Sequence, residues 1–322
     1  MYKLDMKDRK IIYELDKNCR QSNNQIAKKV RLSKNAVSYR INRLIRDGVV
    51  KSFHTLINIG KLGYTGFRIY INLKNTTTEI EKEIIDFLKA KPEVTWVASL
   101  EGEYNLGMFI MAKNIHEVDA VWASLLEKYI NYFYERSLAI IVKSSYFSLG
   151  YIIDKERSDY KIVTTSLPDL SIDEVDRKIL KILADDANIP IVDIANKIKY
   201  SSKTIIDRIK KLHQKGVIVA YKAFIDYDKL DYQNYKISFI LSKVKKEKEM
   251  EFREFTKMHP NIVYYEKYIG GGDVEIEIHV KNHSHLRKIM DEIRNRFVDI
   301  LYDYTILQIY EEHKNIFYGS KE

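Results

Sequence analysis

The side chains best suited to molecular recognition in this sequence lie in the segment 33–50, SKNAVSYRINRLIRDGVV. Asn and Arg can make bidentate contacts with base edges, whereas Lys, Ser and Tyr are well suited to phosphates. The candidate DNA contacts in and just after this segment are Ser33, Lys34, Asn35, Ser38, Tyr39, Asn42, Arg43 and Lys51. The alternative is a solvated polar helix face that binds protein or nothing.

The segment occurs twice. Residues 201–218, SSKTIIDRIKKLHQKGVI, repeat its pattern with an offset of 168 (201 − 33), and the tetrapeptide DRKI at 8–11 recurs at 176–179 with the same offset. One offset without an insertion over about 100 residues indicates a tandem duplication. The candidate DNA contacts of the second copy are Lys203, Thr204, Lys210 and Lys211.

The charge of the two copies differs. Residues 1–60 contain 14 Lys and Arg against 5 Asp and Glu, whereas residues 169–228 contain 11 against 10. Asp207 also stands where the first copy has Tyr39, and an outward-facing acid repels phosphate. Because each neutralised phosphate releases counterions, we expect the first copy to bind DNA more strongly and with a steeper salt dependence.

Three helices must position these side chains. Asp5 can cap the first helix, residues 22–25 (SNNQ) form a capping box for the second, and Ser33 can cap the third. Gly48 supplies the residue that ends the third helix. The pattern predicts a helix-turn-helix, and residues 49–59 then read as a strand in the place of a wing. Arg40 and its counterpart Arg208 could contact phosphate or pair with a carboxylate within the module.

The spacing of the hydrophobic residues along the chain changes after residue 60. The pattern predicts strands at 67–73, within 95–112 and at 137–147, with helices at 78–94 and 115–130. This β-α-β-β-α-β order is the ferredoxin-like arrangement, and it recurs in the second copy. We therefore predict an α+β chain with winged helix-turn-helix domains at 1–60 and 171–228, βαββαβ domains at 61–149 and 229–322, and a linker at 150–170.

Composition limits the function classes. The 322 residues are 45% hydrophobic and 31% charged, the net charge is +9, and Cys19 is the single cysteine. These values favour a globular protein, exclude an intrachain disulfide and suggest a polyanionic partner. No apolar run approaches the roughly 20 residues of a membrane span, and residues 1–10 do not resemble a secretory signal. We expect a cytoplasmic protein that does not bind membranes.

The order of LDMKDRKIIYEL, IAKKVRLSKNAVSYRINRLIRDGVV and EGEYNL resembles the Lrp/AsnC (leucine-responsive, feast/famine) family, twice in one chain. The resemblance implies a transcription regulator of double-stranded DNA, with RAM-type βαββαβ domains that pair through their sheets. It also implies an amino-acid effector and homo-oligomers such as dimers. Because family chains typically carry one unit, we expect intrachain pairing of the two βαββαβ domains. Two helix-turn-helix domains in one chain also suit two DNA half-sites about 34–36 Å apart.

The resemblance places an effector pocket at the turn before the third strand. The matching residues are Gly102, Tyr104, Asn105, Gly270, Gly272 and Asp273. The first copy lacks the acid that would bind a ligand ammonium, and the second lacks the tyrosine. The alternative is that the glycines serve only a tight turn and the domain only pairs.

The sequence offers few other sites. Glu275, Glu277 and His279 alternate along one strand, which suggests a ligand or metal site or, preferably, a hydrated sheet face. His283 and His285 follow in a turn, and no metal site is predicted from them. No cofactor is predicted.

Two alternatives to a regulator remain. One is a DNA-packaging protein with little sequence preference. The other is a sirohaem-decarboxylase-like enzyme, since such enzymes resemble this family and fused forms exist. Their segment with His and Arg corresponds to PEVTWVASLEGEYNLGMF (92–109), which has neither residue, so we expect no enzyme.

Overall fold

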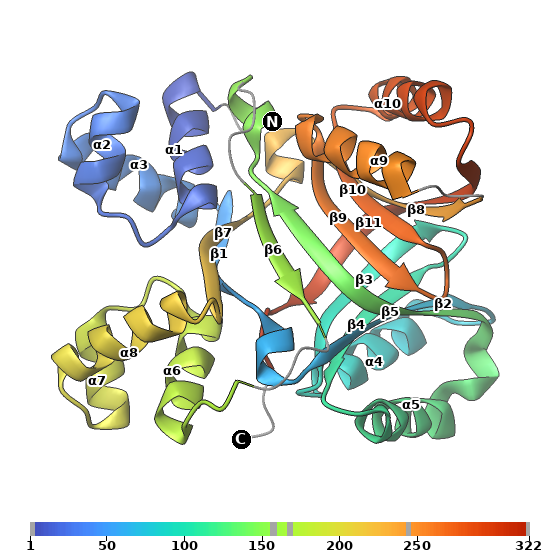
Figure 1. Ribbon diagram of the computed structural model, residues 1–322, viewed down its shortest axis with the longest axis horizontal. Coiled ribbons are helices and arrows are strands. Elements are labelled where there is room, and N and C mark those ends of the chain that lie inside the picture. The colour runs from blue at the N-terminus through green and yellow to red at the C-terminus, as the bar shows by residue number, and fades with distance from the viewer. Residues whose placement is uncertain (1–3, 155–159, 166–169, 243–245, 320–322) are drawn as a thin grey trace.

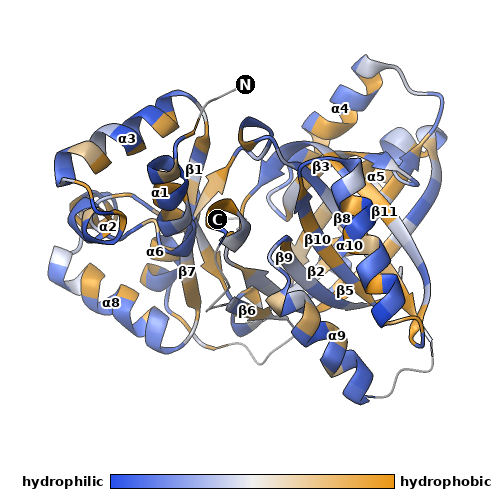
Figure 2. Cartoon of the chain, turned by 90° about the horizontal axis from the view of Figure 1, so that it is seen from above, coloured by the Kyte–Doolittle hydropathy of each residue, from blue (hydrophilic) through white to orange (hydrophobic). Residues whose placement is uncertain are grey.

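The computed structural model describes residues 4–154, 160–165, 170–242 and 246–319. It has two layers. Two three-helix bundles lie one above the other on the left of Figure 1, and a large β-sheet structure with four outer helices lies on the right. Figure 2 shows the same division from above. No helix of the described residues is long and apolar enough to cross a membrane.

The predicted helix-turn-helix is present in both copies. The first consists of α1 (Met6–Lys17), α2 (Asn23–Val30) and α3 (Lys34–Arg46), and the second of α6 (Glu174–Asp185), α7 (Ile191–Ile198) and α8 (Ser202–Gln214). Asp5, Ser22 and Ser33 cap the first three helices as expected. Gly48 follows α3 with φ +69°, a conformation that favours glycine, so the predicted helix stop is confirmed.

The strand after each helix-turn-helix joins the two copies. Strand β1 (Val50–Ile57) pairs antiparallel with β7 (Ile218–Ile225), so the predicted strand is present but its partner is the other copy. The hydrophobic core is continuous across both bundles. Across the junction, Thr55 Oγ1 donates to the Leu183 carbonyl at 2.5 Å. The two helix-turn-helix units therefore form one rigid block around a central ribbon.

The βαββαβ order is confirmed in both copies. The first runs β2 (Thr65–Leu73), α4 (Thr78–Lys89), β3 (Val94–Gly102), β4 (Leu106–Ala112), α5 (Ile115–Tyr129) and β5 (Phe133–Phe147). The second runs β8 (Gln233–Leu241), α9 (Lys246–Met258), β9 (Ile262–Ile269), β10 (Val274–Val280), α10 (His283–Arg296) and β11 (Leu301–Asn315). Short 3-10 helices lie at Ile59–Leu62, Ile130–Tyr132, Gly150–Ile153 and Asp228–Leu230.

The two sheets join edge to edge into a closed barrel. The strand order is β2-β4-β3-β11-β8-β10-β9-β5, and β5 also pairs with β2. The seams between copies are β3–β11 and β5–β9, so the expected intrachain pairing is present. Closure removes free sheet edges. It also creates an interior that two separate sheets would not have.

The segment expected to be a linker contains a strand. Strand β6 (Tyr160–Thr164) pairs antiparallel with the end of β5, Lys143–Phe147. The Thr165 hydroxyl then donates to the Ile141 carbonyl. The start of that expected linker, Gly150–Ile153, is a 3-10 helix, and residues 155–159 and 166–169 lie outside the described residues.

Candidate nucleic-acid interface and barrel cavity

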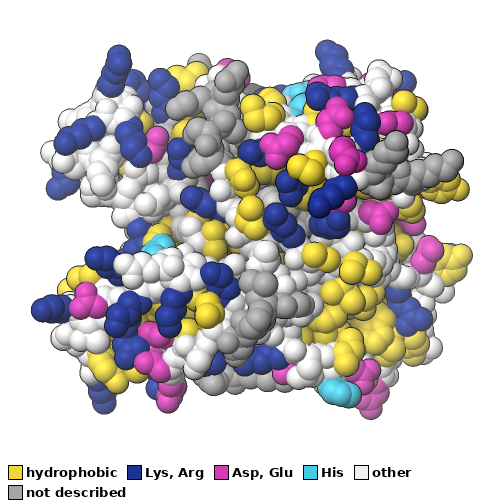
Figure 3. Space-filling model, in the orientation of Figure 1, with side chains coloured by type: hydrophobic (Ala, Val, Ile, Leu, Met, Phe, Trp, Pro, Cys, Tyr) yellow, Lys and Arg dark blue, Asp and Glu magenta, His cyan; other side chains and the backbone are white. Residues whose placement is uncertain are grey.

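Helix α3 presents a polar face to solvent. Lys34, Asn35, Tyr39 and Asn42 are exposed, Tyr39 by 64%, while Val37, Ile41 and Leu44 anchor the opposite face in the core. Ser38 is partly buried at the edge of the same face. Lys and Arg side chains cover much of the visible surface of the two bundles in Figure 3. The exposed set is free to contact bases and phosphates.

Two residues of the predicted interface also have structural roles. The Ser33 hydroxyl accepts from the Ala36 backbone N–H at 3.1 Å and so caps α3. Arg43 Nη2 donates to Asp8 Oδ2 at 2.6 Å. Since Asp8 is 1% exposed, Arg43 holds α3 against α1, and its role as a DNA contact stays a prediction.

Arg40 and Arg208 both pair with carboxylates. Arg40 Nη1 lies 2.7 Å from Asp5 Oδ2 and 2.7 Å from Asp8 Oδ1. In the second copy, Arg208 Nη1 lies 2.6 Å from Asp173 and 2.9 Å from Asp176. The side-chain bonds to Asp5 and Asp8 raise the pKa of Arg40 further. Of the two roles left open by the sequence, the structure has the carboxylate pair in both copies.

Replacing Asp8 with Asn is expected to destabilise the protein by about 3 kcal/mol, because it leaves Arg43 and part of Arg40 without a buried counter-charge. Replacing the counterpart, Asp176, is expected to cost about 1 kcal/mol, since its side chain is 14% exposed and pairs with one arginine. Urea unfolding of both variants measures the difference. Equal losses would contradict the distinction between the copies.

Helix α8 presents a weaker interface. Lys203, Lys210 and Lys211 are exposed, but so is Asp207. The Thr204 hydroxyl bonds the Ser201 hydroxyl at 2.8 Å, within the helix cap. In the first copy, Lys51 lies 3.3 Å from Asp226, the residue after β7, so its charge is already partly neutralised. On the two helices themselves, the exposed Asp207 of α8 agrees with the asymmetry expected from charge.

Each recognition helix is also fixed by a lysine of the other copy. Lys229 Nζ donates to the Asp47 carbonyl at the end of α3, at 2.6 Å. Lys61 Nζ donates to the Lys215 carbonyl at the end of α8, at 2.5 Å. A cation at a helix C-terminus interacts favourably with the carbonyl dipoles there and so stabilises the helix end. This reciprocal contact was not predicted, although both lysines are part of the repeat.

The turns predicted to bind an effector mainly support the barrel. Asn105 Oδ1 accepts from Leu73 N and Asp273 Oδ2 accepts from Leu241 N, both at 2.8 Å, so the two side chains tie down equivalent strand ends. The Tyr104 ring stacks on the Tyr70 ring, with 5.8 Å between the ring centroids. Gly102 packs against the backbone of β11.

The two turns lie against different strands. Gly270 contacts the Leu138 carbonyl of β5, and Gly272 packs against the Tyr268 ring of β9. Each turn is thus packed against a seam of the barrel. The predicted residues therefore do not assemble into one pocket.

The hydrated sheet face expected at β10 is wrong. Glu275 and His279 are both 0% exposed and point, with Glu277, into the closed barrel. Lys236 lies 3.1 Å from Glu275 and 3.2 Å from Glu277. Arg68 lies 3.0 Å from Glu266 and 3.5 Å from Glu275. This network was not predictable from the sequence, because its charged partners come from strands of both copies.

Hydrogen bonds complete the network. Tyr70 donates to Glu275 at 2.6 Å, and Ser144 donates to Glu266 at 2.8 Å. Burial alone would raise the pKa of Glu275, but Lys236 and Arg68 lower it below its usual range. The barrel interior therefore holds Glu275 and Glu277 in their ionised form beside the buried cations Arg68 and Lys236.

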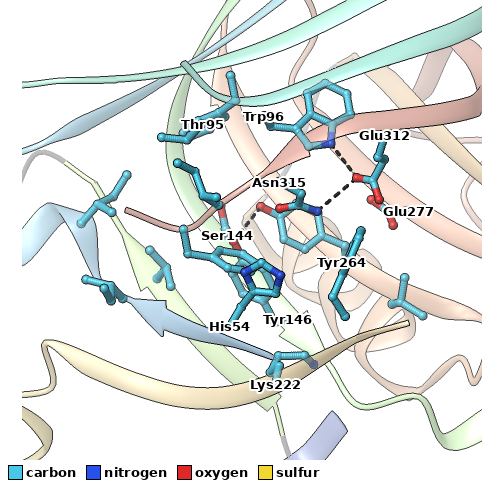
Figure 4. A pocket seen from close by; sticks show the side chains of 18 of the residues that line it. His54, Thr95, Trp96, Ser144, Tyr146, Lys222, Tyr264, Glu277, Glu312 and Asn315 are labelled. Carbon is cyan, nitrogen blue, oxygen red and sulfur yellow. Dashed lines mark hydrogen bonds between the residues drawn. The ribbon is translucent and has the colours of Figure 1, made fainter. Parts of the chain in front are cut away.

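A cavity of about 180 Å³ lies between the barrel mouth and the β1–β7 ribbon. Figure 4 shows His54 of β1 and Lys222 of β7 on one side and Trp96, Tyr264 and Glu312 of the barrel on the other. Burial lowers the pKa of His54 to about 4, so its ring is neutral at physiological pH. The sequence did not indicate this cavity, because its wall is built from strands of both copies that are far apart along the chain.

The histidines considered for a metal site are dispersed. His279 points into the barrel, where Tyr151 Oη lies 2.6 Å from its Nδ1, whereas His283 and His285 lie at the start of α10. No group of three or more His, Cys, Asp or Glu residues in the described part of the chain is arranged to hold a metal ion.

Comparison with known proteins agrees with these features. The family model "Winged helix-turn-helix DNA-binding" matches residues 4–51 and 172–219. The chain is 36% identical over 122 residues to the HTH-type transcriptional regulator FL11 of Pyrococcus horikoshii, covering 38% of this chain and 80% of that protein. Its fold is similar to that of the sirohaem decarboxylase NirDL, with a TM-score of 0.63 at 15% identity over 98% of this chain and 94% of that one.

The solved AsnC family transcriptional regulator from Agrobacterium tumefaciens aligns with one half of the chain. The match has 23% identity and a TM-score of 0.41, and it covers 47% of this chain and 96% of that one. The family assignment rests on the alignment of this chain with FL11, which covers 80% of FL11. The chain therefore belongs to the Lrp/AsnC family of helix-turn-helix transcriptional regulators, with two copies of the family unit in one polypeptide.

Proposed function

We propose that this regulator binds double-stranded DNA in the cytoplasm with α3 as the main reading helix and α8 as a weaker one. The exposed face of Lys34, Asn35, Tyr39 and Asn42 carries this proposal, since it offers base and phosphate contacts without an acid. The corresponding face of α8 includes Asp207.

The rigid block around β1 and β7 supports the use of both helices. The antiparallel ribbon relates the two copies by an approximate two-fold arrangement, and Lys61 and Lys229 hold the ends of both recognition helices. A fixed pair of readers suits two half-sites one helical turn of DNA apart, about 34–36 Å, or a multiple of it. We infer that one chain takes the place of a family dimer.

The outer surface of the barrel supports further self-association. Leu138, Ile140 and Val142 on β5 are exposed next to Ile269 of β9, at the β5–β9 seam between the two copies. Clustered exposed apolar side chains commonly mark interaction surfaces. We propose that copies of the chain associate through this seam.

Competition binding tests the regulator against a DNA-packaging role. Genomic fragments recovered with the bound protein should outcompete random DNA of equal length at physiological salt by on the order of 10³-fold or more. Equal competition by random DNA would support a packaging protein with little sequence preference.

The likeness to NirDL raises an enzymatic alternative, which we propose does not apply. Its support is fold alone, and the cavity of about 180 Å³ is smaller than the roughly 300–1,000 Å³ of sites for drug-sized ligands. The segment 92–109 also lacks His and Arg. Sirohaem incubated with the protein should keep its absorption spectrum.

A further inference from the structure

We propose that the cavity between the β1–β7 ribbon and the barrel binds a small organic amine, whose ammonium group pairs with Glu312. The site differs from the turns around Gly102 and Gly270, where the sequence suggested an effector. Ligand binding itself does not depend on the proposed reading of DNA. Only its consequence for DNA affinity rests on that function.

The charges around the cavity leave one carboxylate without a cation. Arg68 and Lys236 are engaged by Glu266, Glu275 and Glu277, and Lys222 Nζ lies 2.8 Å from Asp16. Three carboxyls and three permanently charged cations line the cavity, and Glu266 and Glu275 behind the wall bring the carboxyls to five. His279 Nε2 lies 3.4 Å from Glu277. Glu312 has no ion pair within 4 Å among the described residues, although Lys236 and Lys51 oppose the rise of its pKa from farther away. The local charge therefore favours a cationic ligand.

Glu312 is held in place by two neutral donors. Trp96 Nε1 donates to its Oε1 at 2.7 Å, and Asn315 Nδ2 donates to the same oxygen at 3.2 Å. No described residue donates to the second oxygen, Oε2. Burial, together with nearby Glu277, raises the pKa of Glu312 to about 7. An ammonium group at Oε2 would supply the missing counter-charge.

The rest of the wall suits the body of such a ligand. Tyr146, Phe224, Tyr264 and Phe317 line the cavity with aromatic surface, which packs against apolar groups and attracts cations. His54 adds a polar contact, because its Nδ1 is buried and has no hydrogen-bond partner, while its Nε2 lies 2.7 Å from Ser52 Oγ. The volume fits a ligand of about amino-acid size.

The cavity lies where a ligand would affect the DNA-reading block. One wall belongs to β1 and β7, which join the two helix-turn-helix units, and the opposite wall belongs to the barrel. A ligand that contacts both walls favours one orientation of the block relative to the barrel. The ligand can change DNA affinity by no more than the ratio of its own affinities for the favoured orientation and the alternative one.

The test uses the full chain without DNA, so that failure of the proposed DNA function does not affect it. Phenethylamine, isoamylamine, phenylalanine and phenylpropionate are titrated by calorimetry. The two amines should bind, and phenylpropionate, which lacks the ammonium group, should not. Phenylalanine distinguishes an amino acid from a simple amine as the source of the ammonium. Affinity for the amines should rise from pH 6 to pH 8 as Glu312 ionises.

Glu312→Gln should weaken amine binding on the order of 10- to 100-fold, since a charge-assisted bond is lost. Glu311→Gln is the matched control, because its side chain is 61% exposed on the same strand. It should leave the affinity unchanged. Glu312→Gln should melt no lower than the wild type at pH 8, as it removes a carboxylate whose ionisation in the fold is disfavoured.

Three results would overturn the proposal. They are no binding of either amine to the wild type at millimolar concentration, equal binding of phenylpropionate, and equal amine affinity of Glu312→Gln and the wild type.

Discussion

Replacing Lys34 and Asn42 together with alanine should weaken DNA binding on the order of 100-fold, since each well-placed contact is worth about 1–3 kcal/mol. Both side chains are exposed on α3 and make no hydrogen bond with a described residue, so the fold should be unaffected. Arg43 is left intact, because its pair with Asp8 holds α3 in place. Fluorescence anisotropy with a recovered genomic fragment measures the change.

The matched variant replaces Lys203 and Lys210 on α8. Its loss should stay below about 10-fold, because Asp207 already disfavours phosphate at this face. The slope of log affinity against log salt should fall by about 1 for each lysine that contacts phosphate. Equal losses in the two double variants would show that both helices read DNA equally.

Replacing Arg68 with Met should lower the free energy of unfolding by about 3–5 kcal/mol, because Glu266 is left buried without its cation. The Arg68 side chain is 6% exposed and that of Glu266 is 0% exposed. Urea unfolding at pH 7 measures the loss. The exposed control, Arg136→Met, should change stability by less than about 1 kcal/mol.

A double variant separates the charge from the packing of Arg68. Combining Arg68→Met with Glu266→Gln should recover much of the lost stability, since the uncompensated charge is removed. Acid should act on the same network. The pKa values of Glu275 and Glu277 are lowered in the fold, so their contribution is present above about pH 4.5 and lost as pH falls below it. No recovery in the double variant would mean that packing dominates.

The local elements were predictable because their signals are local. The caps at Asp5, Ser22 and Ser33, the stop at Gly48 and the β-α-β-β-α-β order all depend on residues a few positions apart. The choice between phosphate and carboxylate for Arg40 was not predictable, because Asp5 and Asp8 approach it only after α1 packs on α3.

The barrel interior could not be read from the sequence, because it depends on pairing between the copies. Arg68 of β2 meets Glu266 of β9 only when the barrel closes. Glu312 was hidden for another reason. Leu307 and Ile309 face inward, and strict alternation along the strand would make Glu311 the next inward-facing residue. A register shift in β11 between Ile309 and Glu311 places Glu312 inward instead.

Footprinting of the wild type and the two recognition-helix variants on one recovered fragment tests the central claim most directly. We predict two protected segments separated by a whole number of helical turns, one of them protected at lower protein concentration. Protection of the stronger segment should be lost in Lys34→Ala/Asn42→Ala and kept in Lys203→Ala/Lys210→Ala. Protection that is unchanged in the first variant, or lost equally in both, would contradict the claim that α3 is the main reader.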